Sequence, residues 1–159
     1  MPAKAKALLS SASDERLDGE TGARLDLGVL SDHVGYFLRR LQVLIFQEFI
    51  AAVDIRPAQY SVLVLIASNP GRSQAAIGRA LNIERAALAR LLHGFERRQW
   101  IERRPSAADA RSHALYLTRA GQAAFVRINA QAMAHERRMA RMLGDRRRRA
   151  LLELLKDFG

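Results

Sequence analysis

The succession of hydrophobic patterns within residues 71–121 constrains the fold of this chain more than any other feature. Residues 73–81 have apolar side chains at helical spacing behind a serine suited to N-capping, and a second helical pattern occupies 84–99. Within residues 101–117, apolar and polar side chains alternate in two runs on either side of a polar tip. Thr118 is placed to cap a further helix. We therefore predict two short helices, a β-hairpin and a helix start in unbroken order.

That order is typical of a winged helix-turn-helix, in which the second helix enters the DNA major groove with its N-terminal residues at the base edges. We therefore predict that Arg85 and Arg90 contact guanine or phosphate, the alternative being a solvated helix face. The small Ala86 lets the backbone approach closely. Glu84 has two interpretations: it accepts from a cytosine amino group, or it favours the positive helix N-terminus, which we prefer.

Four features in this order resemble the MarR family of bacterial transcription regulators. They are the runs 70–78 and 91–96, the Asp-x-Arg of Asp109 and Arg111, and the run 115–121. The resemblance extends over about 29–158. It implies a mainly α fold with a small β-hairpin, in which N- and C-terminal dimerisation helices flank the winged helix-turn-helix.

The resemblance also assigns roles in the wing, where the family arginine enters the minor groove and the aspartate orients the loop. These roles fall on Arg111 and Asp109. The chain departs from the family pattern at Gln99, where glycine is usual, and at Ala110, where a second arginine is frequent. Gln99 is thus expected to be left-handed at some cost. The DNA-binding residues that we predict are Ser73, Gln74, Asn82, Arg85, Ala86, Arg90, Arg103, Arg104, Asp109 and Arg111.

Composition narrows the class of partner. The chain has 159 residues, enough for one domain, and a formal net charge of +10, which favours nucleic acid first and an anionic membrane surface second. It has no cysteine, which excludes disulfides, thiolate metal sites and thiol redox switches. The four histidines are scattered, and we expect no metal and no cofactor. No apolar run approaches the length of a membrane span, so we expect a cytoplasmic protein with no membrane partner.

We predict a flexible arm at 1–28 and a single domain at 29–159. The winged helix-turn-helix takes 57–117, and dimerisation helices take 29–56 and 118–159. A helix around 34–50 is apolar on two faces, and a final helix after Gly144, with Asp145 as its cap, has many leucines. One small domain cannot bury both, so we predict a homodimer. The arginine run 146–149 is open to two interpretations, a nucleic-acid patch or a solvated, partner-facing or Glu153-paired stretch.

The runs 34–40, 84–86 and 111–114 are similar to family members that govern hydroxycinnamate breakdown, some of which sense aromatic acyl-coenzyme A thioesters. This similarity implies a small aromatic carboxylate or an aromatic acyl-CoA as effector. The candidate lining residues combine aromatic rings with a cation, although the aromatic ones are equally compatible with a plain core. They are His33, Tyr36, Phe37, Arg40 and Tyr60.

The sequence therefore predicts a homodimeric, ligand-responsive regulator that binds a pseudo-palindromic double-stranded operator and is released from it by the effector. A sequence-indifferent architectural DNA-binding protein is the alternative, because the excess positive charge would suffice for it. An enzyme is not expected, since the sequence has no cysteine nucleophile and no glycine-rich phosphate loop.

Overall fold

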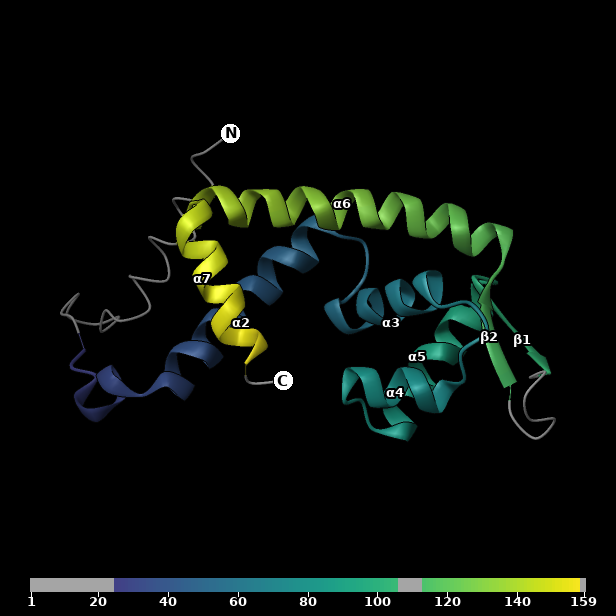
Figure 1. Cartoon of the computed structure of the whole chain (residues 1–159), viewed down its shortest axis with the longest axis horizontal. Coiled ribbons are helices and arrows are strands. Elements are labelled where there is room, and N and C mark those ends of the chain that lie inside the picture. The colour runs from purple at the N-terminus through teal and green to yellow at the C-terminus, as the bar shows by residue number, and fades with distance from the viewer. Residues whose placement is uncertain (1–24, 106–112, 158–159) are drawn as a thin grey trace. The chain divides into compact units, whose positions relative to one another are not determined.

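The computed structural model describes residues 25–105 and 113–157. These residues are mostly helical with one antiparallel hairpin, as predicted, and the chain divides into two compact units, 1–48 and 49–159. The elements run in the order η1 (Gly28–Asp32), α2 (Val34–Ala52), α3 (Pro57–Ser68), α4 (Gln74–Leu81), α5 (Arg85–Arg97), β1 (Ile101–Pro105), β2 (His113–Leu117), α6 (Arg119–Leu143) and α7 (Asp145–Lys156) (Figure 1).

The first unit contains η1 and most of α2. The apolar residues of α2 leave much surface uncovered: Phe37 is 47% exposed, and Leu38, Val43 and Phe46 are exposed as well. This agrees with the prediction that α2 has more apolar surface than one chain covers. The final turn of α2, which includes the buried Phe49, belongs to the second unit.

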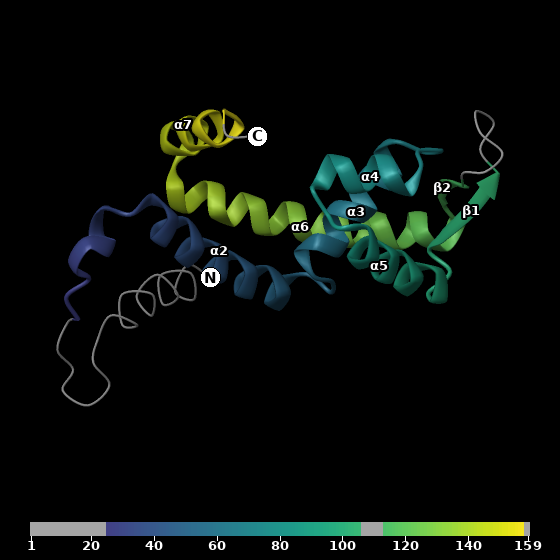
Figure 2. The ribbon, with the colours of Figure 1, turned by 90° about the horizontal axis from the view of Figure 1, so that it is seen from below.

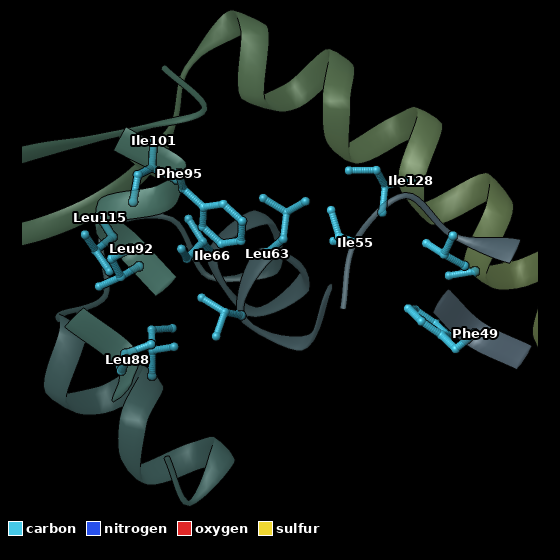
Figure 3. Packing of buried hydrophobic residues seen from close by; sticks show 14 residues of the cluster. Phe49, Ile55, Leu63, Ile66, Leu88, Leu92, Phe95, Ile101, Leu115 and Ile128 are labelled. Atoms are coloured by element: carbon cyan, nitrogen blue, oxygen red, sulfur yellow. The ribbon is translucent and has the colours of Figure 1, made fainter. Parts of the chain in front are cut away.

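Helix α3 is the centre of the second unit. Pro57 occupies its first turn, where a missing N–H costs nothing, and Val62, Leu63 and Ile66 are almost fully buried. Helix α3 contacts α4, α6 and β2, so its apolar faces are covered on several sides. Figure 3 shows Leu63 and Ile66 beside Phe95 and Leu92 of α5, and residues of the hairpin and of α6 belong to the same cluster. Each fully buried aliphatic side chain contributes roughly 1.5–3 kcal/mol to folding. Because α4 and α5 share this core with α3, moving either helix would expose apolar surface, so the core holds both in place.

The helix ends follow the local sequence signals, with one exception. The Ser73 hydroxyl accepts from the Ala76 amide at 3.3 Å, and the Thr118 hydroxyl accepts from the Gly121 amide at 2.9 Å, as their predicted capping roles require. The prediction that Asp145 caps the last helix is wrong. Gly144 occupies the N-cap position with φ +75° and provides no side-chain cap, while Asp145 lies in the first turn of α7.

The hairpin is attached to the start of α4 through the backbone. Ile101 pairs with Leu117 and Pro105 with His113 in an antiparallel register, and Pro105 stands at the strand end, where its lack of an N–H is tolerated. The Gly71 amide donates to the Leu115 carbonyl at 2.9 Å, and the Leu115 amide donates to the Arg72 carbonyl at 3.0 Å. The segment before α4 therefore lies against β2 and forms an isolated antiparallel bridge, in which Ser73 pairs with Ala114.

Helices α6 and α7 extend the second unit away from the hairpin, with α7 at the end of α6 opposite the strands in both views (Figures 1 and 2). Arg148 of the arginine run pairs with Glu136 on α6, its Nη2 lying 2.8 Å from the carboxylate. Of the described helices, no single one is both long and apolar enough to cross a membrane; α2 and α3 would pass only as a bent pair, on length and composition alone.

Candidate nucleic-acid interface

The turn between α4 and α5 is a close helix-turn-helix junction. Asn82 ends α4 in the left-handed region, at φ +49°, which asparagine tolerates better than most residues. Gly78 faces the following helix so closely that a Cβ there would lie 3.3 Å from both the Ile83 carbonyl oxygen and a Leu88 methyl carbon. The Ile83 amide also donates to the Gly78 carbonyl at 3.0 Å. These contacts set the angle at which α5 leaves α4.

Helix α5 presents the polar face that the sequence predicted. Leu88, Leu92 and Phe95 are buried to 1% exposure or less, because their spacing puts them on the side that packs against α3 and the hairpin. Arg85 and Arg90 lie on the exposed side, and Ala86 is exposed between them. A duplex can therefore reach both arginines without any rearrangement of the core.

Glu84 caps α5 with its side chain. Its Oε1 accepts from the Ala86 amide at 3.0 Å, and its Oε2 accepts from the Ala87 amide at 3.1 Å. These two hydrogen bonds, helped by the charge of Arg90, hold the pKa of the Glu84 carboxyl below its ordinary value. The preferred interpretation of Glu84, as a group that favours the helix N-terminus, is confirmed.

A groove of about 690 Å³ opens between α4, the start of α5 and the hairpin. Its polar and charged lining includes predicted residues, Ser73, Gln74, Arg85 and Arg103, together with two that the prediction missed, Arg79 and His113. No carboxylate of the described residues lines it. Such a groove attracts polyanions, and its position beside the exposed end of α5 makes this face the candidate DNA-binding surface.

Sequence spacing could have revealed Arg79. It stands two residues from both the buried Ile77 and the partly buried Leu81, which turns it by about 200° from each and therefore away from the core. The position of His113 at the start of β2 depends on the pairing of the two strands, so its place in the groove follows from tertiary structure.

The two arginines of β1 are held by carboxylates. Arg103 on β1 pairs with Glu96 of α5 through Nε, and its Nη1 donates to the Gln74 side chain at 3.2 Å. Arg104 pairs with Glu102 on its own strand, and its guanidinium carbon lies 4.5 Å from the centre of the Tyr116 ring. Arg103 therefore links the hairpin to both helices of the helix-turn-helix. DNA contact by either arginine stays a prediction.

The junction after α5 contains the departure from the family pattern. Gln99 has φ +55°, so the predicted left-handed conformation is confirmed. Trp100 stacks on Phe95 with ring centres 5.7 Å apart, and the guanidinium of Arg98 lies over the Trp100 ring. Asp109, Ala110 and Arg111 lie outside the described residues, and so does most of the predicted arm.

The predicted effector residues belong to both units. In the first unit, Tyr36 and Phe37 are in edge contact, and Arg40 Nη1 donates to the Tyr36 hydroxyl at 3.3 Å. Arg40 Nη2 is buried without a hydrogen-bond partner among the described residues, and His33 is exposed at the C-cap of η1.

Tyr60, in the second unit, packs near Phe49 and donates its hydroxyl proton to Asn129 Oδ1 at 2.7 Å. Burial raises the pKa of its phenol. Tyr60 therefore fits the alternative interpretation of a core residue. Within 25–105 and 113–157, no three His, Asp or Glu side chains gather in a way that could hold a metal ion.

Comparison with known proteins agrees with this geometry. A family model described as "MarR family" matches residues 53–112, a range that includes the helix-turn-helix and the first strand of the wing. A protein of Thauera aromatica named "Putative transcriptional regulatory protein for hcr operon" is 31% identical over 138 residues, 84% of this chain and 83% of that protein. The chain belongs to the MarR family.

Solved structures of a transcriptional repressor match a similar share of this chain. The transcriptional repressor CouR bound to a 23-mer DNA duplex is 38% identical, with a TM-score of 0.81 over 86% of this chain and 99% of that one. CouR bound to p-coumaroyl-CoA is 37% identical, with a TM-score of 0.78 over 85% and 97% of the two chains. Membership of the family of transcriptional regulators thus rests on sequence and structure together.

Proposed function

We propose that this MarR-family chain is a ligand-responsive DNA-binding repressor that acts as a homodimer. The observation that carries the proposal is the groove lined by Arg79, Arg85 and Arg103, on the face where α5 exposes its N-terminal turns; among the described residues, no carboxylate lines it. The 38% identity to a repressor solved on a DNA duplex supports it. A regulator of this kind acts where bacterial DNA is, in the cytoplasm.

On DNA, α5 would lie in the major groove, where Arg85 and Arg90 reach base edges or phosphates. Two subunits would place two such helices about one helical turn, roughly 34 Å, apart on a pseudo-palindromic operator. The wing would follow the backbone, with Arg111 in the minor groove and Asp109 orienting the loop. Arg103 keeps the hairpin at a fixed distance from α5 through Glu96 and so positions the wing.

The effector that we propose is an aromatic carboxylate or aromatic acyl-CoA, and we assign it to the first unit. Tyr36 and Phe37 offer ring faces. Among the described residues, the buried Nη2 of Arg40 has no acceptor, and a ligand carboxylate, thioester carbonyl or phosphate would provide one. The solved complex of CouR with p-coumaroyl-CoA supports this ligand class. Release requires that the ligand bind the DNA-free form more tightly than the DNA-bound form.

The test begins with selection of an operator from a randomised duplex library, followed by titration of the selected and of a random duplex at one salt concentration. A repressor is expected to prefer the selected duplex by about 1,000-fold or more. Equal affinity for both would instead establish the architectural alternative, which depends on phosphate contacts alone.

The effector is tested by titrating p-coumaroyl-CoA and free p-coumarate against the protein and its operator complex. At least one is expected to raise the melting temperature of the free protein and to release the operator. Arg40→Met should abolish this response and leave operator affinity unchanged, while Arg39→Met, at the exposed neighbouring position, should keep both. A full response in Arg40→Met would remove Arg40 from the effector site.

A further inference from the structure

The reading face of α5 contains a fixed negative charge at its leading end. Glu84 is exposed and comes directly before Arg85, on a surface whose neighbouring groove has a basic lining. A carboxylate at this position opposes the polyanion that the rest of the surface attracts. Its presence in a DNA-binding face therefore needs a physical explanation.

The geometry keeps this charge in place. One carboxylate oxygen accepts from the Ala86 amide and the other from the Ala87 amide, so two hydrogen bonds hold the group at the helix end. Both hydrogen bonds favour the ionised form and lower the pKa of Glu84. Glu84 is therefore a negative charge at neutral pH in the free protein.

The cap changes what the end of α5 can bind. Free amides at a helix N-terminus ordinarily form a site for phosphate. Here the Ala86 and Ala87 amides are occupied, and the occupying group repels a phosphate. Each carboxylate oxygen still has a second lone pair, and the major groove offers donors that match it, the exocyclic amino groups of cytosine and adenine.

We infer that Glu84 is a specificity-determining residue, which excludes the DNA backbone from the tip of α5 and accepts a hydrogen bond from a base amino group. This inference rests on the proposed function, because it requires that α5 read DNA in the major groove. Glu84 weakens binding to any duplex that places phosphate at the tip. Only a site with an amino donor at that place compensates for the charge.

The decisive variant removes the charge and keeps the cap. Serine is among the strongest N-cap residues, so Glu84→Ser retains an acceptor for the first-turn amides, and Glu84→Asp retains both cap and charge. Glu153→Ser is the matched control, because it removes one carboxylate from the exposed face of α7, outside the helix-turn-helix. Thermal melts of the full-length dimer check that each variant is folded.

Operator is selected with the wild type from a randomised duplex library, and each variant is titrated against that operator and against random duplex over a range of salt. Glu84→Ser is expected to bind random duplex more tightly, with a salt slope steeper by about one phosphate contact, and to lose about tenfold in its preference for the operator. Glu84→Asp should keep the weak binding to random duplex. Glu153→Ser should change both affinities alike, by less than about twofold.

Repeating the selection with Glu84→Ser locates the base. The new consensus is expected to lose its preference at one symmetry-related position per half-site and to keep it elsewhere. If Glu84→Ser retains the wild-type ratio, salt slope and consensus, the inference is overturned and the proposed function stands. If the wild type itself selects no sequence, the proposed function fails first.

Discussion

Gly121 gives the sharpest test of packing at a single residue. A Cβ at this position would lie 1.8 Å from the Trp100 carbonyl oxygen, which is backbone and cannot move aside freely. We expect Gly121→Ala to destabilise the fold by about 3 kcal/mol, at the upper end of overpacking effects, as read from urea unfolding.

Gly94 is the control, since nothing lies within 4 Å of the Cβ that Gly94→Ala would add in the middle of α5. Alanine there is expected to stabilise the protein by about 0.5–1 kcal/mol through its better helix propensity. Equal effects of the two substitutions would show that the contact between the start of α6 and Trp100 is looser than described.

Gln99 has a conformation that glycine adopts without strain. Its φ of +55° costs a non-glycine residue about 1–3 kcal/mol, part of which glycine recovers at the cost of a more flexible unfolded chain. We expect Gln99→Gly to raise the free energy of unfolding by about 0.5–1 kcal/mol. Asn82→Gly, also left-handed but at a residue type that tolerates it, should change stability by less than about 0.5 kcal/mol. A larger gain from Asn82→Gly would contradict this account.

The sequence predicted single residues well where the signal is local. The caps at Ser73 and Thr118 each depend on a few neighbouring positions, whereas the left-handed Gln99 was predictable only from the glycine that is usual there in the family. Asp145 failed as a cap because Gly144 adopts the N-cap position in a positive-φ conformation that no helical period predicts. Roles that depend on distant partners, such as the Tyr60 to Asn129 hydrogen bond across 69 positions, could not be inferred.

At the scale of elements, Thr118 joins the wing to the long helix. Its hydroxyl accepts from the Gly121 amide and donates to the Gln99 carbonyl at 2.6 Å. One side chain at the end of the hairpin therefore connects the residues after α5 to the first turn of α6. We expect Thr118→Val, which keeps the shape, to cost about 1–2 kcal/mol in urea unfolding. Thr118→Ser retains the hydroxyl and should stay within about 0.5 kcal/mol of the wild type. A loss in both variants would assign the effect to the methyl group.

The helices of the helix-turn-helix and the strands of the hairpin were predictable because the spacing of apolar residues and the turn-forming residues are local features of the sequence. Their mutual arrangement was not predictable in the same way. Charge and position alone predict Arg103 and Arg104 as DNA contacts. In the structure, Arg103 is bonded to Glu96 and Gln74, and Arg104 to Glu102. Strand pairing brings these groups together, and a pattern along one segment contains no information about it.

At the scale of the whole molecule, exposed leucines predict the assembly. On α7, Leu154 is 61% and Leu155 45% exposed, and α2 leaves several large apolar side chains uncovered. We expect Leu154→Glu combined with Leu155→Glu to shift the protein from dimer to monomer in sedimentation velocity, and to weaken operator binding with it, because burying two charges without partners is unfavourable.

Lys156→Glu serves as the control for that experiment, since it also adds negative charge to the exposed last turn of α7 but alters no apolar surface. It should remain dimeric. Persistence of the dimer in the double variant at low concentration would exclude α7 from the interface and leave α2 as the remaining candidate.

The backbone bonds that attach residues 71–73 to β2 have a consequence for the thermodynamics of DNA recognition. Because Gly71 and Leu115 are hydrogen-bonded across this junction, the strands of the wing and the start of α4 are ordered together when the protein folds. Their loss of conformational entropy thus belongs to folding and not to association with DNA. Amides at this junction should exchange with deuterium only through large-scale unfolding. DNA binds the folded protein, so it should slow their exchange by the same factor as that of the core amides, with no additional local protection.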